Sequence, residues 1–240
     1  MYEYEIFKEK LSAMLNAAGM PEYLTCGEKL YTVVSRLEEC GKKFNLTAIT
    51  EPDEVMKKHL LDCLFMAKTV EKLNAKTLID IGSGAGFPSL PVSSALKDLS
   101  VTALDSTQKK VDYMNETAAI AGIGNFHAVG SRAEEFVSTC RETYDIACAR
   151  AVASLPVLCE LCIPYVKVGG YFVAMKGSAA EDGMREAARG VAKLGCDNGT
   201  LIPYSIPFAE DKRFLIIYRK NSPTPEQYPR NFSQISKKPL

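Results

Sequence analysis

The sequence predicts an α/β fold in which a doubly wound, mostly parallel sheet of Rossmann-like topology follows an N-terminal helical segment. The first observation is a short apolar run at 77–81 that leads directly into the glycine-rich loop 82–86. The second is the alternation of strand-like and helix-like segments beyond Lys76, which is typical of parallel βαβ units. The third is a pair of strand candidates, 201–206 and 213–219, joined by too few residues for a parallel crossover.

The composition is that of a globular protein. The 240 residues are 47% hydrophobic, which is enough for one domain with a modest extension and no stabilising disulfide or metal. The 29 basic and 29 acidic residues cancel, so overall charge does not indicate a nucleic-acid partner. Segment 211–240 differs, because it holds seven basic and two acidic residues. Such a segment either meets phosphates or is simply solvated.

Neither a signal peptide nor a membrane span is expected. The first 20 residues carry several charges, and no apolar run approaches the ~20 residues that cross a bilayer. We therefore expect a cytoplasmic protein with no membrane partner. We also expect a monomer. The eight cysteines fit reduced thiols in or near the core. Cys159 and Cys162 have metal-ligand spacing, but no second pair or nearby histidine completes a site, so no metal is expected.

Residues 1–73 are expected to form a helical cap ahead of the sheet. Helices are predicted at 4–18 and 22–40, because apolar residues recur there at mixed three- and four-residue spacing. The stretch 41–50 is polar at its start and lacks helical periodicity. It therefore separates the first two helices from a third.

The third helix is expected to begin at Thr50 and to run through Phe65. Thr50 is the predicted N-cap, and Pro52 suits the first turn. His59 lies on this helix. We interpret it as a solvated or hydrogen-bonded helix histidine rather than as a catalytic residue.

Residues 74–220 are expected to form the Rossmann-like domain, and 221–240 a basic tail. Strands are predicted at the apolar runs 77–81, 100–104, 125–129, 144–149, 170–175, 201–206 and 213–219. Helices are predicted between them at 89–96, 108–121, 133–140, 155–165 and 179–194. A sheet of this size that ends in an antiparallel hairpin is the plan of class I methyltransferases rather than of a nicotinamide-dependent fold.

The glycine loop is expected to cradle a nucleoside-type cofactor. Gly82, Gly84 and Gly86 have no Cβ to obstruct a sharp turn or a close ligand. Their spacing is G-x-G-x-G rather than the dinucleotide fingerprint G-x-G-x-x-G. Asp80 precedes the loop, and an anion there disfavours a phosphate and suits the ammonium group of S-adenosylmethionine.

Asp105 ends the second strand, 19 residues beyond Gly86, and Ser106 follows it. A carboxylate at this place can accept hydrogen bonds from both ribose hydroxyls of a cofactor. Ribose is common to nicotinamide cofactors and to S-adenosylmethionine. The loop spacing and Asp80 therefore carry the preference for the methyl donor.

The ends of the third and fourth strands complete the expected site. A helix begins near Ala133 and Glu134, where the carboxylate either accepts from an adenine amino group or is an ordinary first-turn acid. Arg150 ends the fourth strand and can bind a cofactor carboxylate or a phosphate through two hydrogen bonds. Cys148 lies inside that strand and is expected in the core.

Two catalytic signatures are absent after the fourth strand. The chain has neither the Asn/Asp-Pro-Pro-Tyr/Phe motif used on exocyclic amines nor the Pro-Cys nucleophile used on cytosine carbon. An acceptor whose lone pair is already available, such as a guanine ring N7, needs neither. Positioning alone can then supply up to ~7–11 kcal/mol. We assign no residue to catalysis, with Arg150 as the nearest candidate.

Several motifs together resemble the ribosomal small-subunit methyltransferase G family, also called glucose-inhibited division protein B. In chain order they are Phe44–Pro52, His59–Asp62, Ile79–Pro88, Leu104–Ser106, Ser131–Phe136, Ala149–Ala153 and Lys176-Gly177. The resemblance covers most of the chain. It implies methylation of 16S rRNA at N7 of guanine 527, with S-adenosylmethionine as donor and the rRNA or the small subunit as partner.

The resemblance also implies residue roles. Gly82 and Phe87 match loop positions that contact the cofactor, Ala133 and Glu134 match the adenine-side pair, and Arg150 matches the strand-end arginine. Four basic residues are expected to contact the RNA, and these are Lys176, Arg230, Lys237 and Lys238. Lys176 also fits a snorkelling surface lysine. The family's basic C-terminal segment departs here after Arg230, which leaves the RNA contacts of the tail open.

Three alternatives stay open at this point. One is an S-adenosylmethionine-dependent enzyme that acts on a small molecule. Another is a ribosome-binding factor without catalysis, against which the glycine loop and Asp105 argue. A nicotinamide oxidoreductase is the least favoured.

Overall fold

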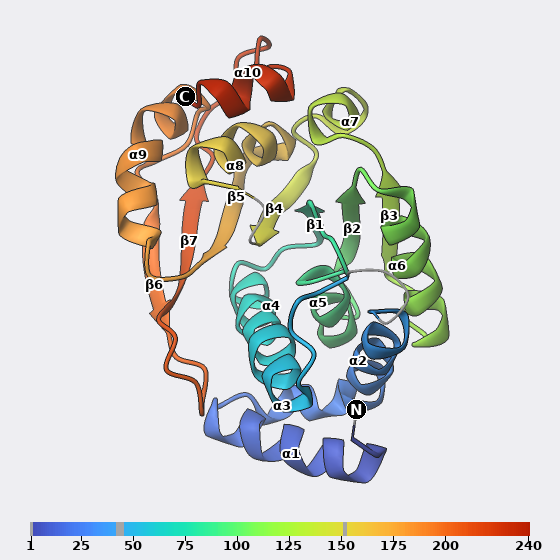
Figure 1. Ribbon diagram of the computed structural model, residues 1–240. Coiled ribbons are helices and arrows are strands. Elements are labelled where there is room, and N and C mark those ends of the chain that lie inside the picture. Colours follow the sequence, from blue (N-terminus) through green and yellow to red (C-terminus); the bar gives the residue numbers. More distant parts are fainter. Residues whose placement is uncertain (1, 42–45, 151–152) are drawn as a thin grey trace.

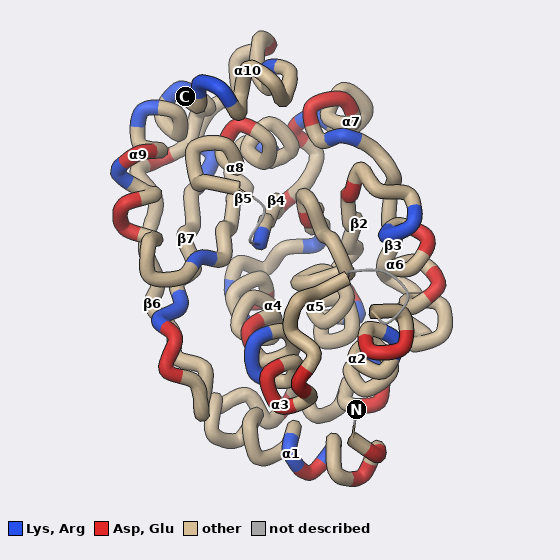
Figure 2. Tube along the Cα trace, viewed as in Figure 1, with Lys and Arg blue, Asp and Glu red and all other residues tan. Residues whose placement is uncertain are grey.

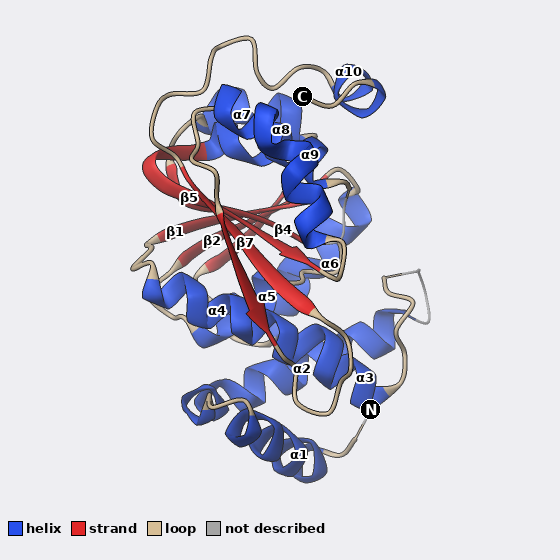
Figure 3. Cartoon of the chain, turned by 90° about the vertical axis from the view of Figure 1, so that its left-hand side faces the viewer, coloured by secondary structure: helices blue, strands red, loops and turns tan. Residues whose placement is uncertain are grey.

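A seven-stranded sheet forms the centre of the protein and lies between two layers of helices (Figures 1 and 3). This computed structural model describes residues 2–41, 46–150 and 153–240. The strands are β1 (Thr77–Ile81), β2 (Ser100–Asp105), β3 (Phe126–Gly130), β4 (Tyr144–Arg150), β5 (Val166–Lys176), β6 (Thr200–Tyr204) and β7 (Arg213–Arg219). Their order across the sheet is β3-β2-β1-β4-β5-β7-β6.

The pairing of the strands confirms the predicted topology. Strands β1 to β5 pair in parallel, and β7 runs antiparallel to both β5 and β6. The expected terminal hairpin is therefore present. The fifth strand is longer than predicted, because it begins at Val166, which pairs with Tyr144 of β4, and not at Gly170.

The two faces of the sheet are covered by different helices. One face packs with α4 (Asp62–Lys72), α5 (Ser89–Ala95) and α6 (Gln108–Ile120) in a single hydrophobic cluster. The opposite face packs with α7 (Ala133–Cys140), α8 (Leu155–Cys162) and α9 (Ala180–Lys193), and η3 (Ile163–Tyr165) follows α8. This two-sided cover explains why the central strands are nearly all apolar.

The N-terminal helices extend the first layer. They are α1 (Tyr4–Ala17), η1 (Pro21–Cys26), α2 (Gly27–Gly41), α3 (Pro52–Val55) and η2 (Met56–Leu61). Their apolar side chains share one hydrophobic cluster with α5, α6 and a face of the sheet. The division into a cap at 1–73, a domain at 74–220 and a tail at 221–240 stays a prediction.

Three expectations about this region need correction. The second helix does not start as an α-helix at Glu22, because Pro21–Cys26 forms a 3₁₀ helix first. Thr50 is not the N-cap, since that position is taken by Glu51, whose side chain makes no capping hydrogen bond. The third helix is not uniform, because the π-helix η2 interrupts it between α3 and α4. Phe44 and Asn45 of the matching motif lie outside the described residues, as do Ala151 and Val152.

The C-terminal segment folds back over α8 and α9 and contains α10 (Phe232–Lys237) (Figure 3). Arg230 forms an ion pair with Glu160, whose side chain is fully buried in α8. Arg141 donates to the backbone carbonyls of Thr224 and Tyr228. In the view of Figure 2, acidic and basic segments are interspersed along the chain, and basic segments lie near the C-terminus. The tail is thus attached at several points.

The cysteines are free thiols, and all but Cys140 are buried, as expected. Cys148, Cys159 and Cys162 are at most 1% exposed. Among residues 2–41, 46–150 and 153–240, no group of His, Cys, Asp or Glu side chains is arranged to hold a metal ion. In the same residues, no helix combines the length and apolar character that crossing a membrane requires.

Candidate functional site

The glycine loop follows β1 and is fastened to the end of β2. Gly82, Gly84 and Gly86 all have positive φ, at 73°, 62° and 85°. A Cβ on Gly86 would lie 2.4 Å from Leu90 Cδ1, so α5 packs against the loop at a distance that only glycine permits. The amide of Gly82 donates to the carbonyl of Leu104 at 2.8 Å. The end of β1 and the spacing of the three glycines together place the loop at the carboxyl edge of the sheet.

Asp105 lies beside this loop, and its side chain is bound by backbone donors on both oxygens. Gly84 N donates to Oδ2 at 3.0 Å, and Thr107 N donates to Oδ1 at 2.9 Å. Lys110 Nζ lies 4.0 Å from Oδ2. A carboxylate oxygen has two lone pairs, so each oxygen of Asp105 retains capacity to accept a hydroxyl donor.

A cavity of about 490 Å³ opens at these strand ends. All eight residues predicted to contact a cofactor line it, and these are Gly82, Gly84, Phe87, Asp105, Ser106, Ala133, Glu134 and Arg150. They come from the ends of β1, β2, β3 and β4, which meet at one edge because the strands are parallel. The size falls within the ~300–1,000 Å³ typical of small-molecule sites.

Asp80 does not reach the cavity, which corrects the role expected for its charge. The residue is fully buried beneath the loop, and its Oδ2 accepts a 2.6 Å hydrogen bond from Ser83 Oγ. Burial raises the pKa of the Asp80 carboxyl. Asp80 therefore shapes the turn from below and presents no anion to a ligand.

Arg150 forms one wall of the cavity and is fixed by the π-helix η2. Its Nη1 donates to the carbonyl of Lys58 at 3.0 Å, and its Nη2 lies 3.0 Å from His59 Nδ1. Asp62 Oδ2 lies 3.6 Å from Nη1. The guanidinium also lies over the Phe87 ring, with its Cζ 5.6 Å from the centroid. Arg150 is thus held in one orientation by its neighbours.

His59 was expected to be either solvated or hydrogen-bonded, and it is hydrogen-bonded. It is not solvated, because only 7% of the residue is exposed. Arg150 can only donate, so His59 Nδ1 accepts, and Nε2 carries the proton donated to Thr47 Oγ at 2.9 Å. Burial, with Arg150 and Arg213 nearby, lowers the pKa of His59 to about 3. The imidazole is therefore neutral near pH 7.

The far end of the cavity holds two residues that are not among the predicted cofactor contacts. Phe232, from α10, lines the cavity with 37% of its surface exposed, and Arg132 Cζ lies 5.1 Å from its ring centroid. Arg132 Nε in turn lies 3.8 Å from Glu134 Oε1. A tail residue was not predictable here, because only the folded path of residues 221–240 brings it to the sheet edge.

The basic residues expected on RNA occupy different surroundings. Lys176 is half-buried at the end of β5, where its Nζ donates to the carbonyl of Ala153 at 2.7 Å. Burial lowers the pKa of Lys176. Arg230 is engaged by Glu160 through two side-chain hydrogen bonds. Lys237 and Lys238 are exposed at the end of α10.

Two known proteins similar to this chain in sequence carry the name of one family. The family described as rRNA small subunit methyltransferase G matches residues 27–211. A protein of Clostridium botulinum (strain Eklund 17B / Type B) named ribosomal RNA small subunit methyltransferase G is 40% identical over 215 residues, covering 89% of this chain and 90% of that protein. A protein of the same name from Clostridium perfringens (strain 13 / Type A) is 41% identical over 206 residues, covering 85% and 86%.

Solved structures share the fold at low sequence identity. An O-methyltransferase from Bacillus cereus, in complex with SAH, aligns with a TM-score of 0.58 and 15% identity over 79% of this chain and 91% of that chain. A second, described as a putative O-methyltransferase from Klebsiella pneumoniae, aligns with a TM-score of 0.56 and 14% identity over 79% and 90%. The predicted class I methyltransferase fold is confirmed.

Proposed function

This chain belongs to the rRNA small subunit methyltransferase G family, and on that premise we propose that it transfers a methyl group from S-adenosylmethionine to N7 of guanine 527 in 16S rRNA. The observation that carries the proposal is the meeting of the glycine loop, Asp105 and Arg150 at one cavity of suitable size. The family relationship makes the protein an S-adenosylmethionine-dependent rRNA methyltransferase. The atom and the position follow from the motif resemblance.

The cavity fits the donor by its chemistry. We propose that Asp105 accepts from the ribose hydroxyls, since both of its oxygens keep free lone pairs. Gly82 and Gly84 leave room beside the loop for close approach of the ligand. Ala133 and Glu134 are assigned to the adenine side, with Phe232 and Arg132 as the outer rim. Phe87 and Ser106 complete the contacts.

S-adenosylmethionine, when bound, supplies an electrophilic methyl group. Guanine N7 carries a lone pair and no proton, so no residue of the chain has to remove one. The neutral state of His59 agrees with this, because the Nδ1 lone pair that a base would need is already used by Arg150. The chain's contribution is therefore to orient both reactants and to exclude water, for which positioning effects are large.

The RNA-binding side remains a proposal. We assign Lys237 and Lys238 to phosphate contacts because they are exposed at the end of α10. Lys176 is assigned to the same side, and Arg230 is assigned to holding the tail in place. We also propose that the protein acts as a cytoplasmic monomer on the rRNA or on the small subunit.

The test is a methylation assay on small-subunit rRNA that lacks the modification. The protein is incubated with that RNA and the methyl donor, and the nucleosides are then separated by mass. We expect 7-methylguanosine at one site in amounts that approach one per rRNA. A protein that binds the donor and this RNA yet forms no 7-methylguanosine would contradict the proposal.

A further inference from the structure

We propose that a second cavity, separated from the cofactor cavity by Arg150 and His59, binds a backbone phosphate of the RNA beside the target guanine. This cavity measures about 280 Å³, and Arg150 and His59 line both cavities. The inference rests on the proposed function, because it places the nucleotide that the methyl group must reach. It adds an anion site to which no role has yet been given.

The second cavity is lined by basic side chains from four separate parts of the fold. Lys58 comes from η2, Arg150 from the end of β4, Lys176 from the end of β5 and Arg213 from the start of β7. These strand ends meet because β7 is antiparallel to β5 and brings Phe214 opposite Lys176. The cluster is thus produced by the terminal hairpin and not by one run of basic sequence.

Four cations face three carboxylates, those of Glu54, Asp62 and Asp211, so the cluster keeps a positive excess of one charge. Asp62 lines the cavity, but its side chain is 2% exposed and accepts from Tyr204 Oη at 2.6 Å. His59 is neutral near pH 7, because burial and the neighbouring Arg150 and Arg213 lower the pKa of its imidazole. Arg213 Nε is buried and has no hydrogen-bond partner among the residues that the structure describes. A donor of that kind is costly unless a ligand accepts from it.

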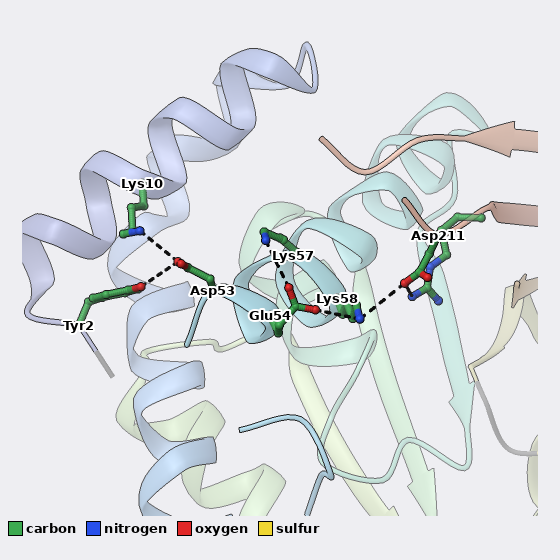
Figure 4. A network of polar contacts seen from close by, with 8 residues as sticks. Tyr2, Lys10, Asp53, Glu54, Lys57, Lys58 and Asp211 are labelled. Carbon is green, nitrogen blue, oxygen red and sulfur yellow. Dashed lines mark hydrogen bonds and ion pairs between the residues drawn. The ribbon is translucent and has the colours of Figure 1, made fainter. Parts of the chain in front are cut away.

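Asp211 does not line the cavity, but it bridges two of the cations that do. Its Oδ2 lies 3.6 Å from Lys58 Nζ and 3.4 Å from Arg213 Nη2, while Glu54 holds Lys58 from the other side at 2.8 Å (Figure 4). Asp211 is half exposed. We infer that its carboxylate takes the place of a phosphate when RNA is absent and gives way when RNA binds.

A phosphate fits this cluster better than the target base does. Methyl transfer forms the N7–CH₃ bond and breaks the S–CH₃ bond, so the positive charge moves from sulfur to the guanine ring and no proton is released. Lys58 and Arg213 would repel such a ring, whereas phosphate oxygens accept from arginine and lysine in most nucleic-acid complexes. The base itself therefore belongs in the cofactor cavity, where the methyl group is held.

The test measures binding of unmodified small-subunit rRNA, without cofactor, over a series of salt concentrations. Arg213→Gln and Lys58→Gln should each lower the slope of log affinity against log salt by about 0.7–1, the effect of one lost phosphate contact. Asp211→Asn should raise RNA affinity several-fold at low salt, because it removes the competing carboxylate. A gain of affinity does not arise from misfolding.

Two substitutions serve as matched controls. Lys57→Gln lies next to Lys58 and shares its partner Glu54, but Lys57 does not line the cavity. Arg219→Gln lies at the other end of β7 from Arg213. Both controls should keep the wild-type slope, and all five variants should bind S-adenosylmethionine as wild type does.

The outcome separates this inference from the proposed function. If wild type methylates the rRNA while Arg213→Gln and Lys58→Gln keep its salt slope, the phosphate site is refuted and the enzyme assignment stands. Unchanged or weaker RNA binding by Asp211→Asn would also refute it. If wild type forms no 7-methylguanosine, the proposed function fails, whatever the slopes show.

Discussion

The ion pair between Arg230 and Glu160 allows a quantitative test of how the tail is held. The Glu160 side chain is fully buried and accepts three hydrogen bonds, from Arg230 N at 2.9 Å, Nε at 2.8 Å and Nη2 at 2.6 Å. Replacing Arg230 with alanine removes two of these bonds and leaves a buried carboxylate without its counter-charge. Breaking such a pair from one side costs about 3–5 kcal/mol.

Urea unfolding of Arg230→Ala at pH 7 should therefore show a loss of about 3–5 kcal/mol in the free energy of unfolding. Limited proteolysis should cut the variant within residues 221–240 faster than wild type, because the pair fastens the tail to α8. The double variant Arg230→Met with Glu160→Leu should recover most of the loss, since it leaves no buried charge unpaired.

A loss below 1 kcal/mol in Arg230→Ala would refute this account of the tail. It would mean that Glu160 reaches water when its partner is absent. A double variant as unstable as the single one would refute the electrostatic explanation, because packing alone would then account for the loss. Arg185→Ala, an exposed pair partner of Asp182 on α9, is the control and should change stability by less than about 1 kcal/mol.

Three further predictions concern the cofactor side. Asp105→Ala should weaken donor binding, measured by calorimetry, by about 1.5–3 kcal/mol while RNA affinity stays unchanged; a change below twofold would remove Asp105 from the site. The free energy of unfolding of His59→Gln should approach that of wild type as pH falls from 6.5 towards 3, because wild type loses up to about 1.4 kcal/mol of it per pH unit. If urea unfolding showed the same difference at every pH, the buried neutral imidazole would be contradicted. Phe232→Ala should weaken donor binding by about 0.5–1.5 kcal/mol, whereas Phe232→Tyr should not. If the alanine variant bound the donor as tightly as wild type, the ring would lie outside the site.

His59 makes the folded protein less stable at low pH, because folding lowers the pKa of its imidazole. The pKa of His59 is lowered in the folded protein to about 3, from an ordinary value of 6.5. Between these values the unfolded chain binds a proton that the folded chain does not. Stability from this group is therefore complete above pH 6.5 and decreases as pH falls towards 3.

The strands and the cofactor cavity were largely predictable from local sequence. Apolar runs that end in glycine or aspartate fix the strand ends, and parallel pairing then collects Gly82, Asp105 and Arg150 at one edge. The positions of these residues along the chain are enough for this prediction, because each residue lies at the end of its own strand. The terminal hairpin was predictable for a similar reason, since 213–219 follows 201–206 too closely for a crossover.

Features that depend on tertiary contacts were not predictable. Asp80 has the charge expected of a ligand contact, but its side chain points beneath the loop to Ser83. The π-helix turns His59 into the core, and helical periodicity contains no signal for that extra residue per turn. Phe232 reaches the cofactor cavity only because Arg230 and α10 fasten the tail across α8.

The partition made by Arg150 and His59 has a thermodynamic consequence. Because both side chains belong to both cavities, an occupant that shifts them on one side changes the free energy of occupancy on the other. Linkage then requires equal reciprocal factors: whatever the methyl donor does to RNA affinity, RNA does to donor affinity. The methyl donor and the RNA would therefore bind with positive or negative cooperativity. The sign depends on the position that the Arg150 guanidinium adopts between the two cavities.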